Sequence, residues 1–278
     1  YDEYFERVVA WNKHRYGFDV KKEEICQVPG VVAGINNALQ AFTKAGENVM
    51  IMQPVYHPFR LVTEALGRKV VDCPLLFVDG RYEVDFNLME KLAPSCKALI
   101  LCNPHNPGGF TWKPETLKRI ADICFRCGVV VIDDEIHADL VFNGYKHTPF
   151  LSVSAEAEAV GVTLQSPTKA FNMPGVIAAH TIVKDSKLRR RFFDYLRGSD
   201  ADMLSAFSYD CVSACYTPEG EEWLNQMLEY VRENIEYVCR YCSENIPSVH
   251  PICPEASFLV FLDCRQLGFS SQKRFNSF

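Results

Sequence analysis

Apolar and amphipathic segments alternate along the first two thirds of the chain. Apolar positions that recur with helical spacing predict helices over residues 2–16, 31–44, 58–66 and 114–127. Short apolar runs predict strands over residues 48–52, 69–73, 97–102, 129–133 and 160–165. This alternation is typical of an α/β fold in which helices flank a largely parallel sheet.

The pattern changes after about residue 187. It predicts long helices over 187–197, 202–216 and 219–242, and then one apolar strand over 257–262. We therefore expect two domains, a large one over residues 1–195 and a smaller α+β domain over residues 196–278. A lone strand leaves the backbone N–H and C=O groups along its edges without hydrogen-bond partners. Its partners lie either beyond residue 278, which would leave the small domain incomplete, or in an element that the pattern does not reveal.

The composition is that of an ordinary globular protein. Of the 278 residues, 48% are hydrophobic and 23% charged, and the formal net charge is -6. The mild, dispersed charge does not favour a nucleic-acid-binding protein. No apolar run approaches the roughly 20 residues that span a bilayer, and the acidic first residues are unlike a signal peptide. We expect a cytoplasmic protein with neither a nucleic acid nor a membrane as partner.

The chain contains 12 cysteines. Most lie inside apolar strands and helices, where free cysteine behaves as a small buried hydrophobe. Cys124 and Cys127 have C-x-x-C spacing, as do Cys239 and Cys242, but the two pairs lie in predicted helices that are far apart in the sequence. A zinc or redox site is therefore the last of our hypotheses. We expect no metal and a reducing compartment.

Candidate chemistry gathers where predicted strands end. The segments are Pro-Gly-Val-Val at 29–32, Asn-Pro-His-Asn-Pro-Gly-Gly at 103–109, Asp-Asp-Glu-Ile-His at 133–137 and Ser-Pro-Thr-Lys at 166–169. In open α/β sheets, ligands bind at this edge. The order of the four segments along one chain is more specific than any of them alone.

The first two chemical candidates are a lysine and an aspartate. Lys169 follows a buried strand and a tight turn, so partial desolvation would lower the pKa of its amine and suit it to Schiff-base chemistry. A surface lysine is the commoner fate of such a residue. Asp133 and Asp134 end a very apolar strand, where carboxylates are costly unless a metal or a protonated pyridine nitrogen compensates them. The alternative is that both are solvated loop acids.

The other two segments offer neutral groups. Asn106 lies in a rigid turn that either presents side-chain amides to a ligand or is an ordinary turn of these residue types. Gly30 precedes a predicted helix, whose free backbone N–H groups could bind a phosphate. An ordinary helix start explains that glycine equally well.

This order of segments resembles the fold-type I pyridoxal-phosphate (PLP) enzymes of the aminotransferase class I/II superfamily. Within this superfamily, the sequence motifs are similar to those of the MalY/PatB-type cystathionine β-lyase branch. The resemblance is carried by the phrases PGVVAGINNALQAF, QPVYHPF, LCNPHNPGG, VVVIDDEIHADLVF, SPTKAFNMPG and PEASFLVFLDCR, and it extends over essentially the whole chain. It implies a seven-stranded-type sheet flanked by helices and pyridoxal 5'-phosphate as the cofactor.

The resemblance also implies roles for individual residues. Lys169 would bind the cofactor covalently and later move the Cα proton of the substrate, while Asp134 would pair with the pyridinium nitrogen. Asn106 would donate a hydrogen bond to the phenolic oxygen. The remaining implied contacts are stacking by Tyr56, phosphate binding by the backbone of Gly30, Val31 and Val32 and the hydroxyls of Ser166 and Thr168, and His137 in the place of a tyrosine of many aminotransferases.

The implied reaction is α,β-elimination of S-substituted cysteines such as cystathionine, which yields a thiol, pyruvate and ammonia. The partners would be a small amino-acid substrate and a second subunit, in a homodimer. One alternative is an aminotransferase that uses the same residues. Another is a regulatory protein of the same fold with little turnover. The residues do not indicate which thioether is preferred.

The chain departs from the family pattern at three places. Many relatives have an arginine seven or eight residues after the lysine, where this chain has Val176 and Ile177, although the lyase branch also tends to lack it. The arginine that binds the substrate carboxylate and an N-terminal Gly-Tyr segment both fall outside the sequence. The chain therefore resembles the middle of a longer enzyme, and Arg265 is a candidate substitute for the missing arginine.

Overall fold

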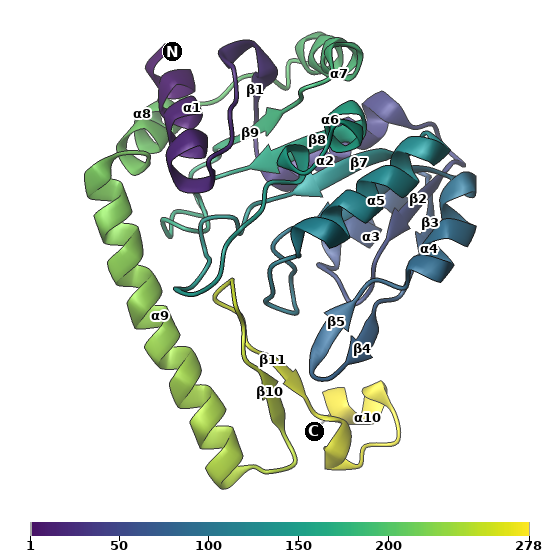
Figure 1. Cartoon of the computed structure of the whole chain (residues 1–278), viewed down its shortest axis with the longest axis vertical. Coiled ribbons are helices and arrows are strands. Elements are labelled where there is room, and N and C mark those ends of the chain that lie inside the picture. Colours follow the sequence, from purple (N-terminus) through teal and green to yellow (C-terminus); the bar gives the residue numbers. More distant parts are fainter. Residues whose placement is uncertain (1, 278) are drawn as a thin grey trace.

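The computed structural model describes residues 2–277 and contains a seven-stranded sheet covered by helices on both faces (Figure 1). The strand order is β1-β9-β8-β7-β6-β2-β3. β9 is antiparallel to both β8 and β1, whereas the other neighbours from β8 to β3 are parallel. The strands are β1 (Ile25–Val28), β2 (Asn48–Ile51), β3 (Lys69–Asp72), β6 (Cys96–Cys102), β7 (Val130–Asp134), β8 (Gly161–Gln165) and β9 (Ala179–Ile182).

The two faces of the sheet bury separate apolar clusters, because successive side chains of a strand point to opposite faces. Ile132 packs in the cluster beneath α2 (Val31–Phe42), α3 (Pro58–Ala65) and α7 (Ser186–Gly198). Val131 packs in the cluster on the other face, beneath α1 (Asp2–Tyr16) and α5 (Pro114–Cys127). The shorter helices are α4 (Phe86–Leu92) and α6 (Ala155–Val160), and β4 (Leu76–Val78) pairs with β5 (Arg81–Glu83) in a separate hairpin.

The predicted largely parallel sheet is confirmed, and the bounds of α1 and α5 agree with the sequence pattern. β1 and β9 were not predicted. Each has only four residues and carries a polar side chain, Gln27 or His180, at a buried position. The pattern therefore lacks the apolar run that revealed the other strands.

The C-terminal elements include one long helix (Figure 1). They are α8 (Ala206–Cys215), α9 (Pro218–Asn245), β10 (His250–Ile252), β11 (Phe261–Asp263) and α10 (Gln272–Asn276). β10 and β11 pair in antiparallel fashion, so the lone strand of the sequence pattern has a partner that the pattern missed. That strand begins at Phe261 and not at Ser257, whose φ of 77° and hydrogen bond to the Leu140 carbonyl divert the chain.

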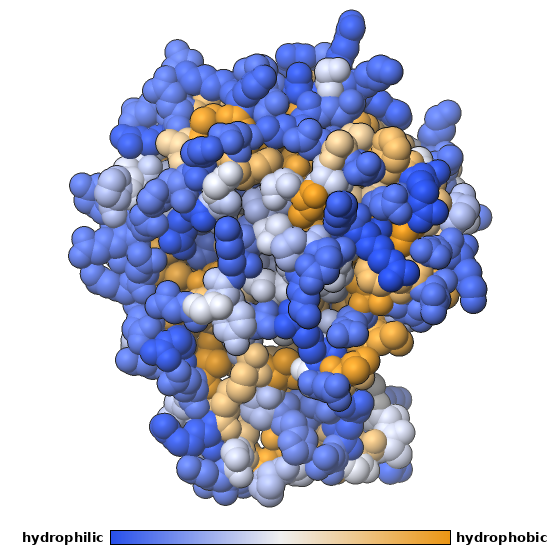
Figure 2. Space-filling view, viewed as in Figure 1, coloured by the Kyte–Doolittle hydropathy of each residue, from blue (hydrophilic) through white to orange (hydrophobic). Residues whose placement is uncertain are grey.

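Polar side chains cover most of the face shown in Figure 2, and apolar side chains show between them, including above the C-terminal elements. Within residues 2–277, none of the helices is both long enough and apolar enough to cross a membrane. All twelve cysteines are free thiols.

Candidate active site

A cavity of about 440 Å³ opens at the carboxyl ends of β6, β7 and β8, beside the N-terminus of α2. Its volume suits a small molecule or cofactor. Every residue predicted for the cofactor site except Ser166 lines it, namely Gly30, Val31, Val32, Tyr56, Asn106, Asp134, His137, Thr168 and Lys169. The structure thus brings together residues that are spread over 140 positions of the sequence.

Asp134 is the most strongly perturbed acid of the cavity. Its side chain is buried, and its Oδ1 accepts a hydrogen bond from the backbone N–H of Ile136 at 3.0 Å. Burial raises the pKa of Asp134 to about 7, and the charge of Glu135 adds to this rise, whereas the Ile136 N–H and Lys169 oppose it. The carboxylate therefore lacks full compensation within the protein. A cationic ring nitrogen of PLP would supply it, so the residue fits the predicted cofactor.

Asp133 lies on the opposite face of β7 and does not line the cavity. It is fully buried, and its Oδ2 accepts a hydrogen bond from the Thr163 hydroxyl at 3.1 Å. The alternative in which both aspartates are solvated loop acids is wrong, because neither side chain reaches solvent. Only Asp134 is placed to meet a ligand in the cavity.

The N-terminus of α2 forms one end of the cavity. Gly30 is the N-cap residue and leaves the first-turn N–H groups without a side-chain cap, so they are free to bind an anion. The helix approaches the sheet closely at Gly34, where a Cβ atom would lie 2.6 Å from Cδ2 of Leu164. The glycine therefore allows α2 to pack closely on the sheet beside the cavity.

The two predicted hydroxyls behave differently. Thr168 lines the cavity. Ser166 does not, because its Oγ donates to the Ala178 carbonyl and lies 2.8 Å from Oγ1 of Thr168. It also accepts a hydrogen bond from the Thr168 N–H at 3.2 Å. Ser166 shapes the turn that presents Thr168 and Lys169, and its contact with a phosphate remains a prediction.

His137 and Tyr56 contribute rings. Burial lowers the pKa of His137 to about 4, and the charge of Lys169 lowers it further, so the imidazole is neutral near pH 7. Its Nδ1 has no hydrogen-bond partner among the described residues, and its ring centroid lies 5.5 Å from that of Phe258. Tyr56 is 37% exposed, and its ring meets Phe59 edge-on.

Sequence reasoning missed part of the cavity wall, formed by Ala33, Cys102, Ile136, Pro174, Phe258 and Leu259. Phe258 and Leu259 come from the segment between β10 and β11. That segment is held to the rest of the protein by Glu255, whose carboxylate accepts hydrogen bonds from Arg81 and from Thr111. The segment PEASFLVFLDCR, which is one of those that carry the family resemblance, contains these residues and could have revealed them.

Cations are scarce at the site. Among the described residues that line the cavity, Lys169 is the only lysine or arginine. Arg265 does not take the role suggested for it, because its guanidinium is bonded to Asp263 at 2.5 and 2.8 Å and lines a separate cavity.

Known proteins are similar to this chain in sequence and fold. Residues 1–276 match the sequence pattern of the family described as Aminotransferase class I and II. The chain belongs to this family. It is 39% identical over 267 residues to cystathionine β-lyase PatB of Bacillus subtilis, a match that covers 95% of this chain and 69% of that protein. The predicted family and branch are confirmed.

Two solved structures have the same fold. Cystalysin from Treponema denticola, which contains pyridoxal 5'-phosphate, superposes with a TM-score of 0.95 at 33% identity, over 100% of this chain and 70% of that one. The PLP-bound C–S lyase from Staphylococcus hominis gives a TM-score of 0.87 at 29% identity, over 95% of this chain and 66% of that one. The predicted fold-type I PLP architecture is therefore confirmed.

Proposed function

We propose that this protein is a PLP-dependent carbon–sulfur β-lyase that eliminates the thiol from S-substituted cysteines such as cystathionine. The observation that carries this proposal is the convergence of Asn106, Asp134 and Lys169 on one cavity in a chain that is 39% identical to a cystathionine β-lyase. Pyridoxal 5'-phosphate, when bound, supplies an electron sink for negative charge at the substrate Cα.

The residues of the cavity divide the chemistry between them. Lys169 would hold the cofactor covalently, and its free amine would remove the Cα proton of a bound substrate. Asp134 would keep the ring nitrogen protonated, because its carboxylate is buried and Lys169 is the only lysine or arginine among the described residues that line the cavity. The Cβ–S bond then breaks with its electron pair on sulfur. A thiolate leaves readily because its conjugate acid has a pKa of about 8.5. Hydrolysis of the remaining three-carbon fragment gives pyruvate and ammonia.

The alternative reaction is transamination by the same residues. Two features favour elimination. His137 stands where many aminotransferases have a tyrosine, and seven and eight residues after the lysine, where many relatives have an arginine, the chain has Val176, which packs on the core, and Ile177, which is exposed. A regulatory protein without turnover is a weaker alternative, because the buried carboxylate of Asp134 is costly unless a cofactor uses it.

Product analysis tests the proposal. The purified protein, supplied with PLP, is given cystathionine in one reaction and alanine with 2-oxoglutarate in another. We expect pyruvate, ammonia and homocysteine from the first. Glutamate from the second reaction, formed at a comparable or faster rate, would instead establish an aminotransferase. Absence of product from both reactions would favour the regulatory alternative.

The assembly and the cellular location are parts of the same proposal. A homodimer is supported by exposed apolar side chains on neighbouring segments, with Ile177, Met203 and Phe207 each at least 60% exposed and Ser208 bonded to the Ile177 carbonyl. Free cysteines fit a reducing cytoplasm. The division into a large domain, residues 1–195, and a small one, residues 196–278, also stays a proposal. The boundary after residue 195 falls inside α7, and a boundary placed after Gly198 would leave that helix whole.

A further inference from the structure

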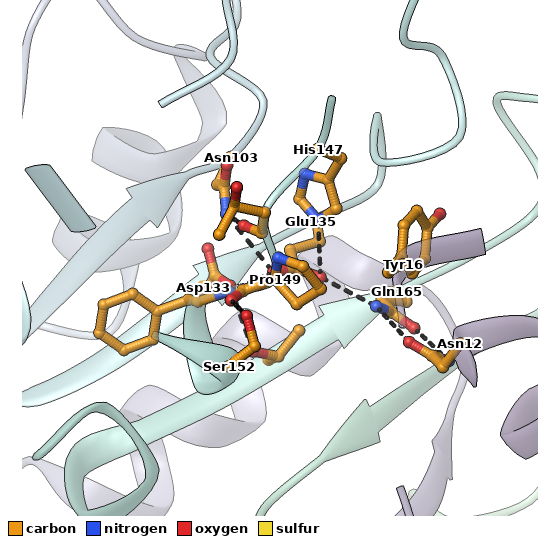
Figure 3. Close-up of polar contacts among 12 residues, drawn as sticks. Asn12, Tyr16, Asn103, Asp133, Glu135, His147, Pro149, Ser152 and Gln165 are labelled. Atoms are coloured by element: carbon orange, nitrogen blue, oxygen red, sulfur yellow. Dashed lines mark hydrogen bonds and ion pairs between the residues drawn. The ribbon is translucent and has the colours of Figure 1, made fainter. Parts of the chain in front are cut away.

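A buried polar cluster lies on the face of β7 opposite Asp134 (Figure 3). We call it the Glu135 cluster, and its members are Asn12, Asn103, Asp133, Glu135, His147 and Gln165. None of these residues lines the cavity, so the proposed reaction does not use them directly. Burying so many polar groups is costly unless they are paired, and their pairing centres on one carboxylate.

The carboxylate of Glu135 is bonded on both oxygens. Oε1 accepts hydrogen bonds from the backbone N–H of Phe150 at 2.9 Å and from Nδ2 of Asn103 at 3.4 Å. Oε2 accepts one from Nε2 of Gln165 at 2.8 Å and lies 3.2 Å from Nε2 of His147. In the backbone, the Glu135 N–H donates to the Leu164 carbonyl at 2.9 Å.

These contacts join the three chain segments that carry the cofactor residues. Asn103 follows β6 and precedes Asn106 by three positions, and Gln165 ends β8 and precedes Lys169 by four. Glu135 itself follows Asp134. One carboxylate therefore anchors the ends of β6, β7 and β8 from the face that the cavity does not use.

The amide of Gln165 has a fixed orientation. Its Oε1 accepts a hydrogen bond from Nδ2 of Asn12 at 3.1 Å and lies 3.2 Å from Nε2 of His180. Its Nε2 donates to Oδ1 of Asn12 at 3.2 Å as well as to Glu135. Gln165 therefore cannot rotate its side-chain amide to offer the oxygen in place of Nε2. With glutamine at position 135, an N–H donor of residue 135 could face the Nε2 donor of Gln165.

The cluster carries its charge on Glu135. Burial and the neighbouring Glu135 raise the pKa of Asp133 well above its ordinary value, so the surroundings of Asp133 disfavour its ionised form. Burial alone would raise the pKa of Glu135 too, but His147 lowers it below the ordinary value. The titratable groups that act on the cluster from outside it are Asp134, Asp139 and His180. Hydrogen bonds to an ionised acceptor are the stronger kind.

We propose that Glu135 is a positioning residue of the active site: its carboxylate holds the ends of β6, β7 and β8 so that Asn106, Asp134 and Lys169 converge on one cavity. The proposal rests on the proposed function, since it assumes that this cavity binds PLP. Glu135 touches neither cofactor nor substrate. It acts through the backbone that it anchors and through its negative charge.

The experiment compares the variants Glu135→Gln, Glu135→Asp and Asp133→Asn with the wild-type protein. Each is stripped of cofactor and titrated with PLP, and the covalent link to Lys169 is trapped with borohydride and mapped. We expect Glu135→Gln to weaken PLP binding by about 10-fold or more, because charge-assisted hydrogen bonds are lost and two amide donors oppose each other. Glu135→Asp should weaken it too, because the shorter side chain cannot reach all its donors.

Asp133→Asn is the matched control. Asp133 lies in the same buried cluster, and an asparagine of nearly the same size can still accept the hydrogen bond from the Thr163 hydroxyl. We expect PLP binding within about 2-fold of wild type, since a conserved hydrogen-bond pattern costs little. Equal losses in Asp133→Asn and Glu135→Gln would overturn the proposal, because the effect would then be general disruption of a buried cluster.

A spectroscopic readout separates positioning from mere stability. The bound cofactor absorbs differently when the nitrogen that joins it to Lys169 is protonated, and a nearby negative charge favours protonation. In Glu135→Gln this change should move to lower pH by roughly half a unit or more, and it should not move in Glu135→Asp or Asp133→Asn. If Glu135→Gln does not fold, Glu135→Asp tests the proposal. It supports the positioning role if it binds PLP more weakly than wild type while its absorbance change occurs at the same pH.

Two failures are distinguishable. Wild-type protein that does not bind PLP at Lys169 would remove the proposed function itself. Normal binding by wild type together with unchanged affinity in both Glu135 variants would overturn the positioning role alone.

Discussion

Replacing Asp134 by asparagine should stabilise the cofactor-free protein at neutral pH while it damages catalysis. Burial raises the pKa of Asp134 to about 7 in the folded protein, against an ordinary value of 3.8. The carboxyl is thus protonated more readily in the folded state than in the unfolded one. Below about pH 4 the carboxyl is protonated in both states and costs no stability. As the pH rises from about 4 to about 7, the unfolded state ionises before the folded state does, so the free energy of unfolding falls over this range.

The size of this cost follows from the pKa difference. At 1.36 kcal/mol per unit of pKa, the cost approaches about 4 kcal/mol above pH 7. Asparagine removes the charge. It keeps an oxygen that can accept the hydrogen bond from the Ile136 N–H. We therefore expect Asp134→Asn to be more stable than wild type at pH 8, and the difference to shrink towards pH 4.

The assay is urea unfolding of the cofactor-free proteins across this pH range, followed by fluorescence, with wild type measured at each pH as the reference. With PLP bound, wild type should be more stable than Asp134→Asn. Removal of the Cα proton by Asp134→Asn should slow by at least ~100-fold, a typical loss for an electrostatic partner. A cofactor-free Asp134→Asn protein that is less stable than wild type at pH 8, or a stability difference that does not change with pH, would refute the reasoning.

Two further predictions concern the lysine and the helix of the cavity. Lys169→Ala should abolish the borohydride-stable link to PLP, as peptide mapping will show, and a reduced cofactor found on another lysine would contradict the assignment. Gly34→Ala should destabilise the protein by about 1–3 kcal/mol in urea unfolding, because its Cβ would lie 2.6 Å from Leu164. It should also weaken PLP binding, since α2 must move away from the sheet. Gly175→Ala, where the added Cβ meets nothing within 4 Å, is the control, and equal effects of the two substitutions would speak against this account.

The central part of the site could be predicted from sequence because its residues closely follow predicted strands along the chain. Asp134 and Lys169 each follow an apolar run of five residues or so, and the order of strands along the chain places such ends at one edge of the sheet. The opposite face of β7 could not be predicted. Nothing local distinguishes Glu135 from a solvated acid, because its partners Asn103 and Gln165 are about 30 positions away.

The missed strands have a similar explanation. His180 in β9 is fully buried, yet its ring is paired with Gln165 and lies 3.3 Å from the hydroxyl of Tyr4, a residue 176 positions earlier. A histidine becomes acceptable in a core only once those partners are in place. β10 is three residues long with Pro251 at its centre, and only pairing with β11 defines it as a strand.

The segment between β10 and β11 is fastened to the body of the enzyme independently of the helix that leads to it. Glu255 and Ala256 donate backbone hydrogen bonds to the Gly109 carbonyl, and Ser257 donates one to Leu140. α9, in contrast, has 28 residues and is about 42 Å long at 1.5 Å per residue. A tilt of so long a helix would displace its far end by several ångströms. The tethered residues lie immediately before Phe258 in the chain, so such a tilt would move β10 and leave Phe258 in place at the cavity.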